Sequence, residues 1–151
     1  MSLIWWTRFV RKCGISVMRI MIDTNVLISI FIFPSAKMLS LIDTITERHT
    51  IVLPSYVLDE LKAVIRRKSP QKYDLLDRFI QRLPFFLAYT PEGIDAEKCP
   101  EIRDKKDLLI LVTAILEDVD VLITGDADFA AVEIERPEIL TPAGFLEKYA
   151  E

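Results

Sequence analysis

The stretch MRIMIDTNVLISIF, from Met18 to Phe31, is nearly all apolar, yet Asp23, Thr24 and Asn25 lie in its middle. Its first part, RIMID, is typical of a short buried strand, and the residues after Asp23 follow a helical pattern with Thr24 or Asn25 as the expected cap. An unpaired carboxylate buried in such a segment costs several kcal/mol. The position of Asp23 at the end of a buried strand therefore needs a physical reason.

Strand-like and helical segments alternate along the rest of the chain. The predicted strands are residues 19–23, 49–54, 85–90, 120–126 and 138–140, and the predicted helices are residues 24–31, 35–48, 55–68, 69–84, 104–119 and 141–149. Pro34 and Ser35 are expected to start one of these helices, and Ser55 is the expected N-cap of the next. Residues 104–119 are apolar enough to predict a buried helix. The alternation predicts a three-layer α/β/α fold with a mostly parallel central sheet of four to five strands.

Composition narrows the class of protein. The chain has 151 residues, of which 51% are hydrophobic and 28% charged, which is typical of one globular domain. The mean hydropathy of +0.27 is high and favours an oligomer. No apolar run reaches the roughly 18 residues that a membrane-spanning helix needs, so no membrane association is expected.

The two cysteines and the single histidine do not form a recognisable metal-binding or catalytic motif. Cys13 and Cys99 have no CxxC spacing and no neighbouring histidine, so neither a zinc site nor a disulfide is indicated and a reducing, cytoplasmic location is expected. His49 is the only histidine. Residues 1–17 differ in character from the rest, and two interpretations stay open: an extension upstream of a true start at Met18, or a segment that packs its tryptophans on a partner.

Acidic residues recur where predicted strands end and the following helices begin. Because the carboxyl ends of parallel strands meet at one edge of a sheet, these acids are expected to lie together. They are Asp23, Glu60, Asp104, Asp107, Asp126 and Asp128. Clustered carboxylates repel one another unless a cation neutralises them, and Mg²⁺ and Mn²⁺ prefer oxygen ligands. The pattern predicts a Mg²⁺ or Mn²⁺ site for phosphodiester cleavage, which explains Asp23 as a metal ligand.

Each acid also has a purely structural interpretation. Asp104 can cap the helix that follows it, with Asp107 completing a capping box. Asp126 can form a turn after Gly125, Asp128 can be a helix cap, and Asp23 can be an Asx-turn residue. These interpretations account for the residues singly, but they do not explain why acids occupy the same edge of the sheet at each crossover.

The helical pattern of residues 57–65 separates Glu60 from its neighbour Asp59. The apolar positions form one stripe, which consists of Val57, Leu58, Leu61, Val64 and Ile65. Asp59 points away from this stripe, whereas Glu60 lies on its flank. Glu60 is therefore the acid expected to reach the edge of a cleft.

Four stretches carry a resemblance to a known family: MIDTNVLIS, LPSYVLDELKAV, RDKKDLLILVTAILEDVDVLITGDADF and TPAGFLEKY. They are similar to the PIN domain, and more specifically to VapC-like ribonucleases, the toxins of prokaryotic toxin–antitoxin pairs. The resemblance runs from about Met18 to the C-terminus, which gives a PIN-like nuclease domain over residues 18–151. It implies a metal-dependent endoribonuclease that cleaves single-stranded or structured RNA, a homodimer or higher oligomer, and a cognate antitoxin.

The acids of the family fall on four residues of this chain. The I-D-T motif places the first on Asp23, and the D/E-E-L motif places the second on Glu60. The third, at the start of the long apolar helix, is Asp107, and the fourth, in the T-G/A-D motif, is Asp126. The resemblance implies that these four are catalytic and hold the metal. Polar positions that orient the acids match three residues, for which capping and turn formation are the open alternative: Thr24, Asn25 and Thr124.

A related branch of the family also has an acid at the position of Asp104, usually followed by proline and further acids. In this chain Lys105, Lys106 and Leu108 replace them, which makes the local charge more positive. The formal net charge of −4 argues against nucleic-acid binding over the whole surface. Two basic clusters remain as RNA-binding candidates, or as solvated helix ends: Arg66, Arg67 and Lys68, and Arg103, Lys105 and Lys106.

Three other functions compete with the ribonuclease. A phosphoryl-transfer enzyme of the haloacid dehalogenase type needs an acid two residues after Asp23, where this chain has Asn25. A PIN-like scaffold that binds RNA or protein without cleavage is expected to lose some acids, and all four are present here. A DNA-directed nuclease uses the same metal chemistry, and no residue pattern here reads a 2′-hydroxyl, so the preference for RNA rests on the resemblance.

Overall fold

The computed structural model describes residues 17–93, 99, 102 and 104–149. Residues 1–16 and Arg103 lie outside this part, so the predictions made for them are not addressed. Within it, one parallel sheet contains β1 (Arg19–Ile22), β2 (Thr50–Pro54), β3 (Phe85–Ala88), β4 (Val121–Ile123) and β5 (Glu138–Leu140). The strand order is β3-β2-β1-β4-β5. The predicted parallel α/β sheet is confirmed.

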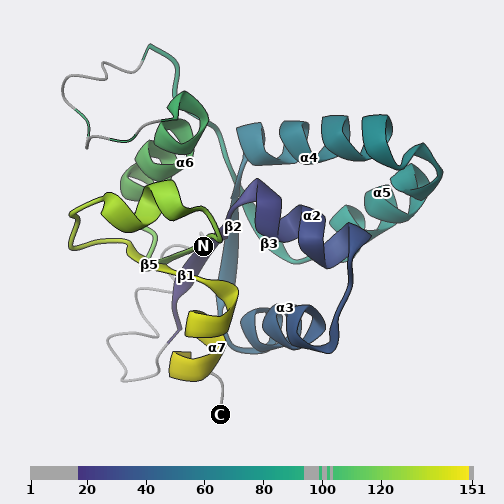
Figure 1. Cartoon of the computed structure of the whole chain (residues 1–151), viewed down its shortest axis with the longest axis horizontal. Helices are drawn as coiled ribbons and strands as arrows, with labels where there is room; N and C mark the ends of the chain where they lie inside the picture. The colour runs from purple at the N-terminus through teal and green to yellow at the C-terminus, as the bar shows by residue number, and fades with distance from the viewer. Residues whose placement is uncertain (1–16, 94–98, 100–101, 103, 150–151) are drawn as a thin grey trace, which may run out of the picture.

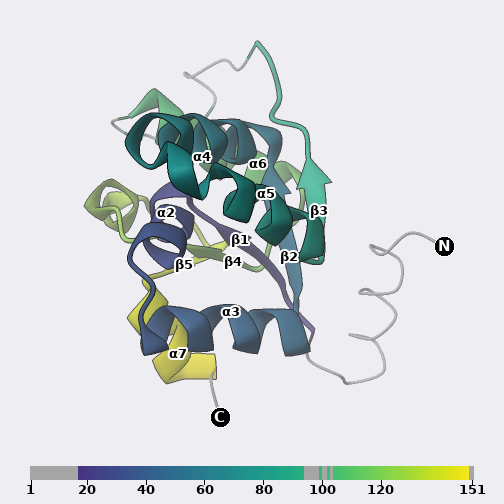
Figure 2. The same cartoon turned by 90° about the vertical axis from the view of Figure 1, so that its right-hand side faces the viewer.

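Helices cover both faces of the sheet. The helical segments are α2 (Thr24–Ile32), α3 (Ala36–Arg48), α4 (Ser55–Lys68), η1 (Pro70–Lys72), α5 (Tyr73–Arg82), α6 (Lys105–Leu116), η3 (Ala127–Ala131) and α7 (Pro142–Tyr149). Helices α3 and α7 lie on one side of the sheet, and α4, α5 and α6 lie on the other (Figures 1 and 2). The three predicted layers are therefore confirmed. No described helix is both long and apolar enough to cross a membrane.

The central strands are buried along their length because they are apolar on both faces, as parallel strands under two helix layers require. Ile20, Met21 and Ile22 of β1 have no exposed surface. Phe129 from η3 and Phe145 from α7 add the largest fully buried side chains. This packing fixes the strand ends from which the acidic residues project.

Two predicted helix caps were wrong, although both helices begin at the predicted residues. Asp23 itself is the N-cap of α2, and Thr24 is the first helical residue. Ser55 is the first residue of α4 rather than its cap. Its Oγ accepts a hydrogen bond from the backbone N–H of Thr90 at 3.0 Å, so its hydroxyl joins α4 to the segment after β3. Ser35, expected at the start of α3, is its N-cap, since its side chain accepts from the backbone N–H of Met38 in the first turn.

Two predicted helices also differ from the structure. Residues 69–84 divide into η1 and α5, with Pro70 at the start of the first segment. The predicted burial of residues 104–119 holds for the middle of α6, where most side chains from Asp107 to Ala114 are buried, but Lys105 and Lys106 at its start are exposed. Its last residues, Ile115 and Leu116, are 41% and 66% exposed.

The strand order places a reversal at the centre of the sheet. From β1 the chain proceeds outward to β2 and β3, and it then crosses to the other side of β1 to form β4 and β5. In open parallel sheets, ligands bind outside the carboxyl ends of the two strands at such a switch point. Asp23 follows β1, and Thr124 and Asp126 follow β4.

Candidate metal centre

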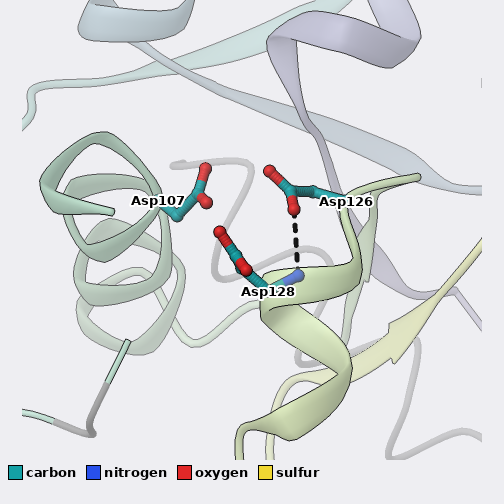
Figure 3. A group of neighbouring side chains, drawn as sticks. All are labelled: Asp107, Asp126 and Asp128. Carbon is teal, nitrogen blue, oxygen red and sulfur yellow. Dashed lines mark hydrogen bonds between the residues drawn. The ribbon is translucent and has the colours of Figure 1, made fainter. Parts of the chain in front are cut away.

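Three carboxylates converge beyond the carboxyl end of β4. Asp107, Asp126 and Asp128 each offer one oxygen, and these oxygens lie within 4.8 Å of one another. Figure 3 shows the three side chains pointing toward a common space, Asp107 from α6 and the other two from the segment after β4. Opposite ligands of a Mg²⁺ ion, each about 2.1 Å from it, lie about 4.2 Å apart. The spacing of the three oxygens therefore fits one hard divalent cation.

Asp107 is the acid in this group that burial affects most. It is 6% exposed, and its Oδ2 has no hydrogen-bond partner among the described residues. Burial, followed by the negative charges of Asp126, Asp104 and Asp23, raises the pKa of Asp107 to about 7. Its protonated form can donate to Asp126, and its ionised form needs a cation. The residues present thus fit a bound divalent metal.

Asp126 is held by its own backbone neighbourhood. Its backbone N–H donates to Thr124 Oγ1 at 3.1 Å, and its Oδ1 accepts from the backbone N–H of Asp128 at 2.9 Å. Asp126 is therefore the N-cap of η3, and Asp128 lies in the first turn of that segment. The predicted capping role of Asp128 was wrong.

Thr124 connects the acids that follow β1 and β4. Its Oγ1 donates to Asp23 Oδ2 at 2.8 Å, and both side chains are 3% exposed. The backbone N–H of Asp23 also donates to the carbonyl of Ile123 at 3.0 Å. Burial raises the pKa of Asp23, and the hydrogen bond from Thr124 acts in the opposite direction. Thr124 thus fixes the carboxylate of Asp23 and the backbone of Asp126 together.

Glu60 reaches the same edge of the sheet from α4. Its Oε2 accepts from Thr24 Oγ1 at 3.0 Å, and its Oε1 lies 3.8 Å from Lys106 Nζ. Glu60 is half-buried whereas Asp59 is exposed, so the predicted orientation of this helix is confirmed. Asp104 caps α6 by accepting from the backbone N–H of Lys106 at 2.9 Å, which confirms its predicted structural role.

The other sequence candidates differ in how close they lie to the acids. Asn25 is exposed in the first turn of α2. Arg66 lies six residues beyond Glu60 on α4, about 9 Å along the helix axis at about 1.5 Å per residue. Its Nη2 donates to the Tyr73 hydroxyl at 2.9 Å. The cluster Arg66, Arg67 and Lys68 thus forms the last turn of α4, and Lys105 and Lys106 begin α6 beside the acids.

Tyr56 is a neighbour of the acids that the sequence prediction missed. It is half-buried in the first turn of α4, four residues before Glu60. Burial and the negative charges of Glu60, Asp104 and Asp107 raise the pKa of Tyr56. A spacing of four residues places two side chains on one helix face, so this signal was present in the sequence.

Binding of Mn²⁺ to this centre is expected to release protons at mildly acidic pH. Because the pKa of Asp107 is raised to about 7, its carboxyl is mostly protonated below that pH, and a metal ion has to displace the proton. Calorimetric titrations in buffers of different ionisation enthalpy should show release of nearly one proton at about pH 6 and little at about pH 8. Affinity that does not change over this range would contradict the assignment of Asp107 as a ligand.

Comparison with known proteins agrees with this geometry. Residues 19–128, well over half of the chain, match the PIN domain. A chain in the crystal structure of VapBC2 from Rickettsia felis bound to a DNA fragment from their promoter is similar, with a TM-score of 0.63 and 23% identity over 82% of this chain and 97% of that one. A search of curated proteins gave no match. The family match includes the strands β1 and β4 and the acids that follow them, and the chain belongs to the PIN domain family.

Proposed function

We propose that this protein is a metal-dependent endoribonuclease and the toxin of a toxin–antitoxin pair. One observation carries the nuclease proposal: the buried Asp107, with an oxygen that no described residue bonds, faces Asp126 and Asp128 across a space that fits one cation. Membership of the PIN domain family supports it. The motif resemblance to VapC-like ribonucleases and the fold likeness to a VapBC2 chain support the toxin assignment.

We propose Asp23, Glu60, Asp107 and Asp126 as the catalytic residues. Asp128, which shares the three-carboxylate cluster with Asp107 and Asp126, and Asp104 are proposed as further metal ligands. A bound Mg²⁺ or Mn²⁺ supplies activation of water and neutralises charge on the phosphate. The role of the chain is to hold the carboxylates in place before the metal and substrate arrive. Two buried threonine hydroxyls hold two of these carboxylates in place by hydrogen bonds: Thr124 donates to Asp23, and Thr24 donates to Glu60.

Lys106 supplies positive charge where the substrate phosphate would lie. Its side chain is 64% exposed and its ion pair with Glu60 spans 3.8 Å, so this pair is weak and easily exchanged. We propose that the ammonium of Lys106 contacts the RNA backbone, with Lys105 next to it. Arg66, Arg67 and Lys68 would hold a more distant part of the strand.

Cleavage of end-labelled single-stranded RNA tests the proposed activity. Cutting is expected with Mn²⁺ or Mg²⁺ and not with EDTA, and Asp23→Asn should lower the rate more than about 100-fold because the buried ligand loses its charge. Asp59→Asn is the matched control, since Asp59 is exposed one residue from Glu60. Labelled single-stranded DNA is run in parallel.

Three outcomes would contradict parts of this proposal. Cutting that persists in EDTA or in Asp23→Asn would exclude the metal mechanism, and cutting of DNA alone would exclude RNA as the substrate. If no cutting occurs and Mn²⁺ binds wild type and Asp23→Asn alike, the protein is a PIN-like scaffold that binds RNA or protein.

Several large apolar side chains are exposed on the described part of the protein. Phe33 and Tyr89 are 73% and 79% exposed, and Leu116 at the end of α6 is 66% exposed. Single exposed apolar groups are common on monomers, so the proposed partners rest on the motif resemblance to VapC-like toxins. We propose a second copy of the chain and a cognate antitoxin as the partners. An antitoxin gene beside this one would support the toxin assignment.

A further inference from the structure

A hollow of about 350 Å³ opens beside Asp126, between the first turns of α2, α3 and α7. Its volume lies within the range of roughly 300–1,000 Å³ that small-molecule sites occupy. Asp126 lines this hollow and also belongs to the acidic cluster, so the two sites share a wall. A polymer held at the acidic cluster could therefore place its next unit in the hollow.

The lining of the hollow combines an apolar wall with polar groups. Val26, Met38 and Pro142 provide the apolar surface, and Asn25 and Ser29 provide an amide and a hydroxyl. The side-chain amide of Asn25 makes no hydrogen bond within the described part of the chain, and Asn25 is exposed. An aromatic base needs this combination of a flat apolar contact and a few hydrogen-bonding groups at its edge.

Lys37 gives the hollow its positive charge. It is exposed in the first turn of α3 and lines the hollow, and no carboxylate of the described residues forms an ion pair with it. Lys106, in contrast, already lies near Glu60. The charge of Lys37 is therefore available for an anion from outside the protein.

A neighbouring hollow that Asp126 also lines contains acidic rather than basic side chains. This second hollow of about 390 Å³, which shares Asp126 and Thr141 with the first, is lined by Glu135 and by Glu138, whose carboxylate forms an ion pair with Lys148. Glu135 repels a phosphate there, whereas Lys37 attracts one in the first hollow. The charges thus indicate on which side of the acidic cluster a nucleic-acid strand continues.

We propose that the hollow at Lys37 binds the nucleotide next to the cleaved phosphate, with the base against Met38 and Pro142 and the phosphate on Lys37. Asn25 would contact the edge of the base. This inference rests on the proposed function, because it takes the acidic cluster as the place of cleavage. It adds to that function a subsite for one nucleotide and the side of the acidic cluster on which the strand continues.

Nuclear magnetic resonance with ¹⁵N-labelled full-length protein tests the subsite without relying on cleavage. The four ribonucleoside 5′-monophosphates and inorganic phosphate are titrated separately in EDTA. Saturable shifts are expected at the amides of Gly125, which lines the hollow, and Gly144 in α7, while the amide of Gly93 stays unchanged. Lys37→Gln should weaken nucleotide binding about tenfold, and the control Arg78→Gln on the exposed face of α5 should not.

The results separate this inference from the proposed function. Absence of shifts, or equal binding by wild type and Lys37→Gln, would overturn the subsite even if RNA is cleaved. Inorganic phosphate that binds as tightly as every nucleotide would overturn the contact with the base. Nucleotide binding that depends on Lys37, in a protein that cleaves no RNA, would support the subsite and refute the nuclease.

Discussion

Replacing Asp107 with asparagine is expected to make the metal-free protein more stable and to abolish RNA cleavage. Asparagine keeps the shape of the side chain but carries no charge, so the repulsion from Asp126, Asp104 and Asp23 disappears. The same change removes an anionic ligand from the proposed metal site, which should lower the cleavage rate more than about 1,000-fold. A gain in stability together with a loss of activity would identify Asp107 as a functional group that the fold itself does not favour.

The stability gain has a definite dependence on pH. The pKa of Asp107 is about 7 in the folded protein and 3.8 is its ordinary value, so the folded state holds this proton more tightly than the unfolded chain. The contribution of Asp107 to the free energy of unfolding of wild type should therefore decrease as pH rises from about 4 to about 7, and it should stay constant above about pH 7. The asparagine variant has no carboxyl group at this position, so its free energy of unfolding does not show this decrease. The full shift corresponds to at most about 4 kcal/mol, and we expect about 1–3 kcal/mol at pH 8 because nearby charges are partly screened.

Urea denaturation in EDTA measures this difference in the free energy of unfolding. Wild type and Asp107→Asn should agree near pH 4 and diverge by pH 8, and saturating Mn²⁺ should stabilise wild type far more than the variant. Asp59→Asn, which changes an exposed acid of α4, is the control and should follow wild type throughout. An asparagine variant that is less stable than wild type at pH 8 would show that Asp107 is stabilised by contacts other than a cation.

Replacing Thr124 with valine is expected to damage both the fold and the proposed site. Valine has nearly the same shape but no hydroxyl, so Asp23 loses its 2.8 Å hydrogen bond and the backbone N–H of Asp126 loses its acceptor. Leaving buried polar groups without partners costs about 1–3 kcal/mol. Because the hydrogen bond from Thr124 acts to lower the pKa of Asp23, its loss should raise that pKa further.

Two measurements separate a positioning role for Thr124 from a merely structural one. Thr124→Val should lower Mn²⁺ affinity about 10- to 100-fold, as the loss of a group that orients a ligand does. Thr124→Ser retains the hydroxyl and should restore most of this affinity while losing some packing. If the serine and valine variants bind Mn²⁺ equally, the hydroxyl does not position Asp23 for the metal.

The sequence by itself determined the features that depend on local patterns. The apolar run before Asp23 is short and ends at an acid, which is enough to place a buried strand and the start of a helix. The helical repeat around residue 60 is likewise local, so it separated Glu60 from Asp59 without a structure. The alternation of such segments, joined to the strand-end positions of the acids, led to the parallel sheet and to the edge at which the acids gather.

The tertiary structure alone decided which of these groups are paired and how deeply they are buried. Ser55 was mistaken for a cap because its partner, Thr90, lies 35 residues away. The position of Lys37 beside Asp126 depends on how α3 packs against the start of α7, and no local pattern encodes it. The raised pKa of Asp107 arises from burial under elements distant in the chain. Periodicity is set by neighbours along the chain, whereas burial, charge pairing and hollows are set by neighbours in space.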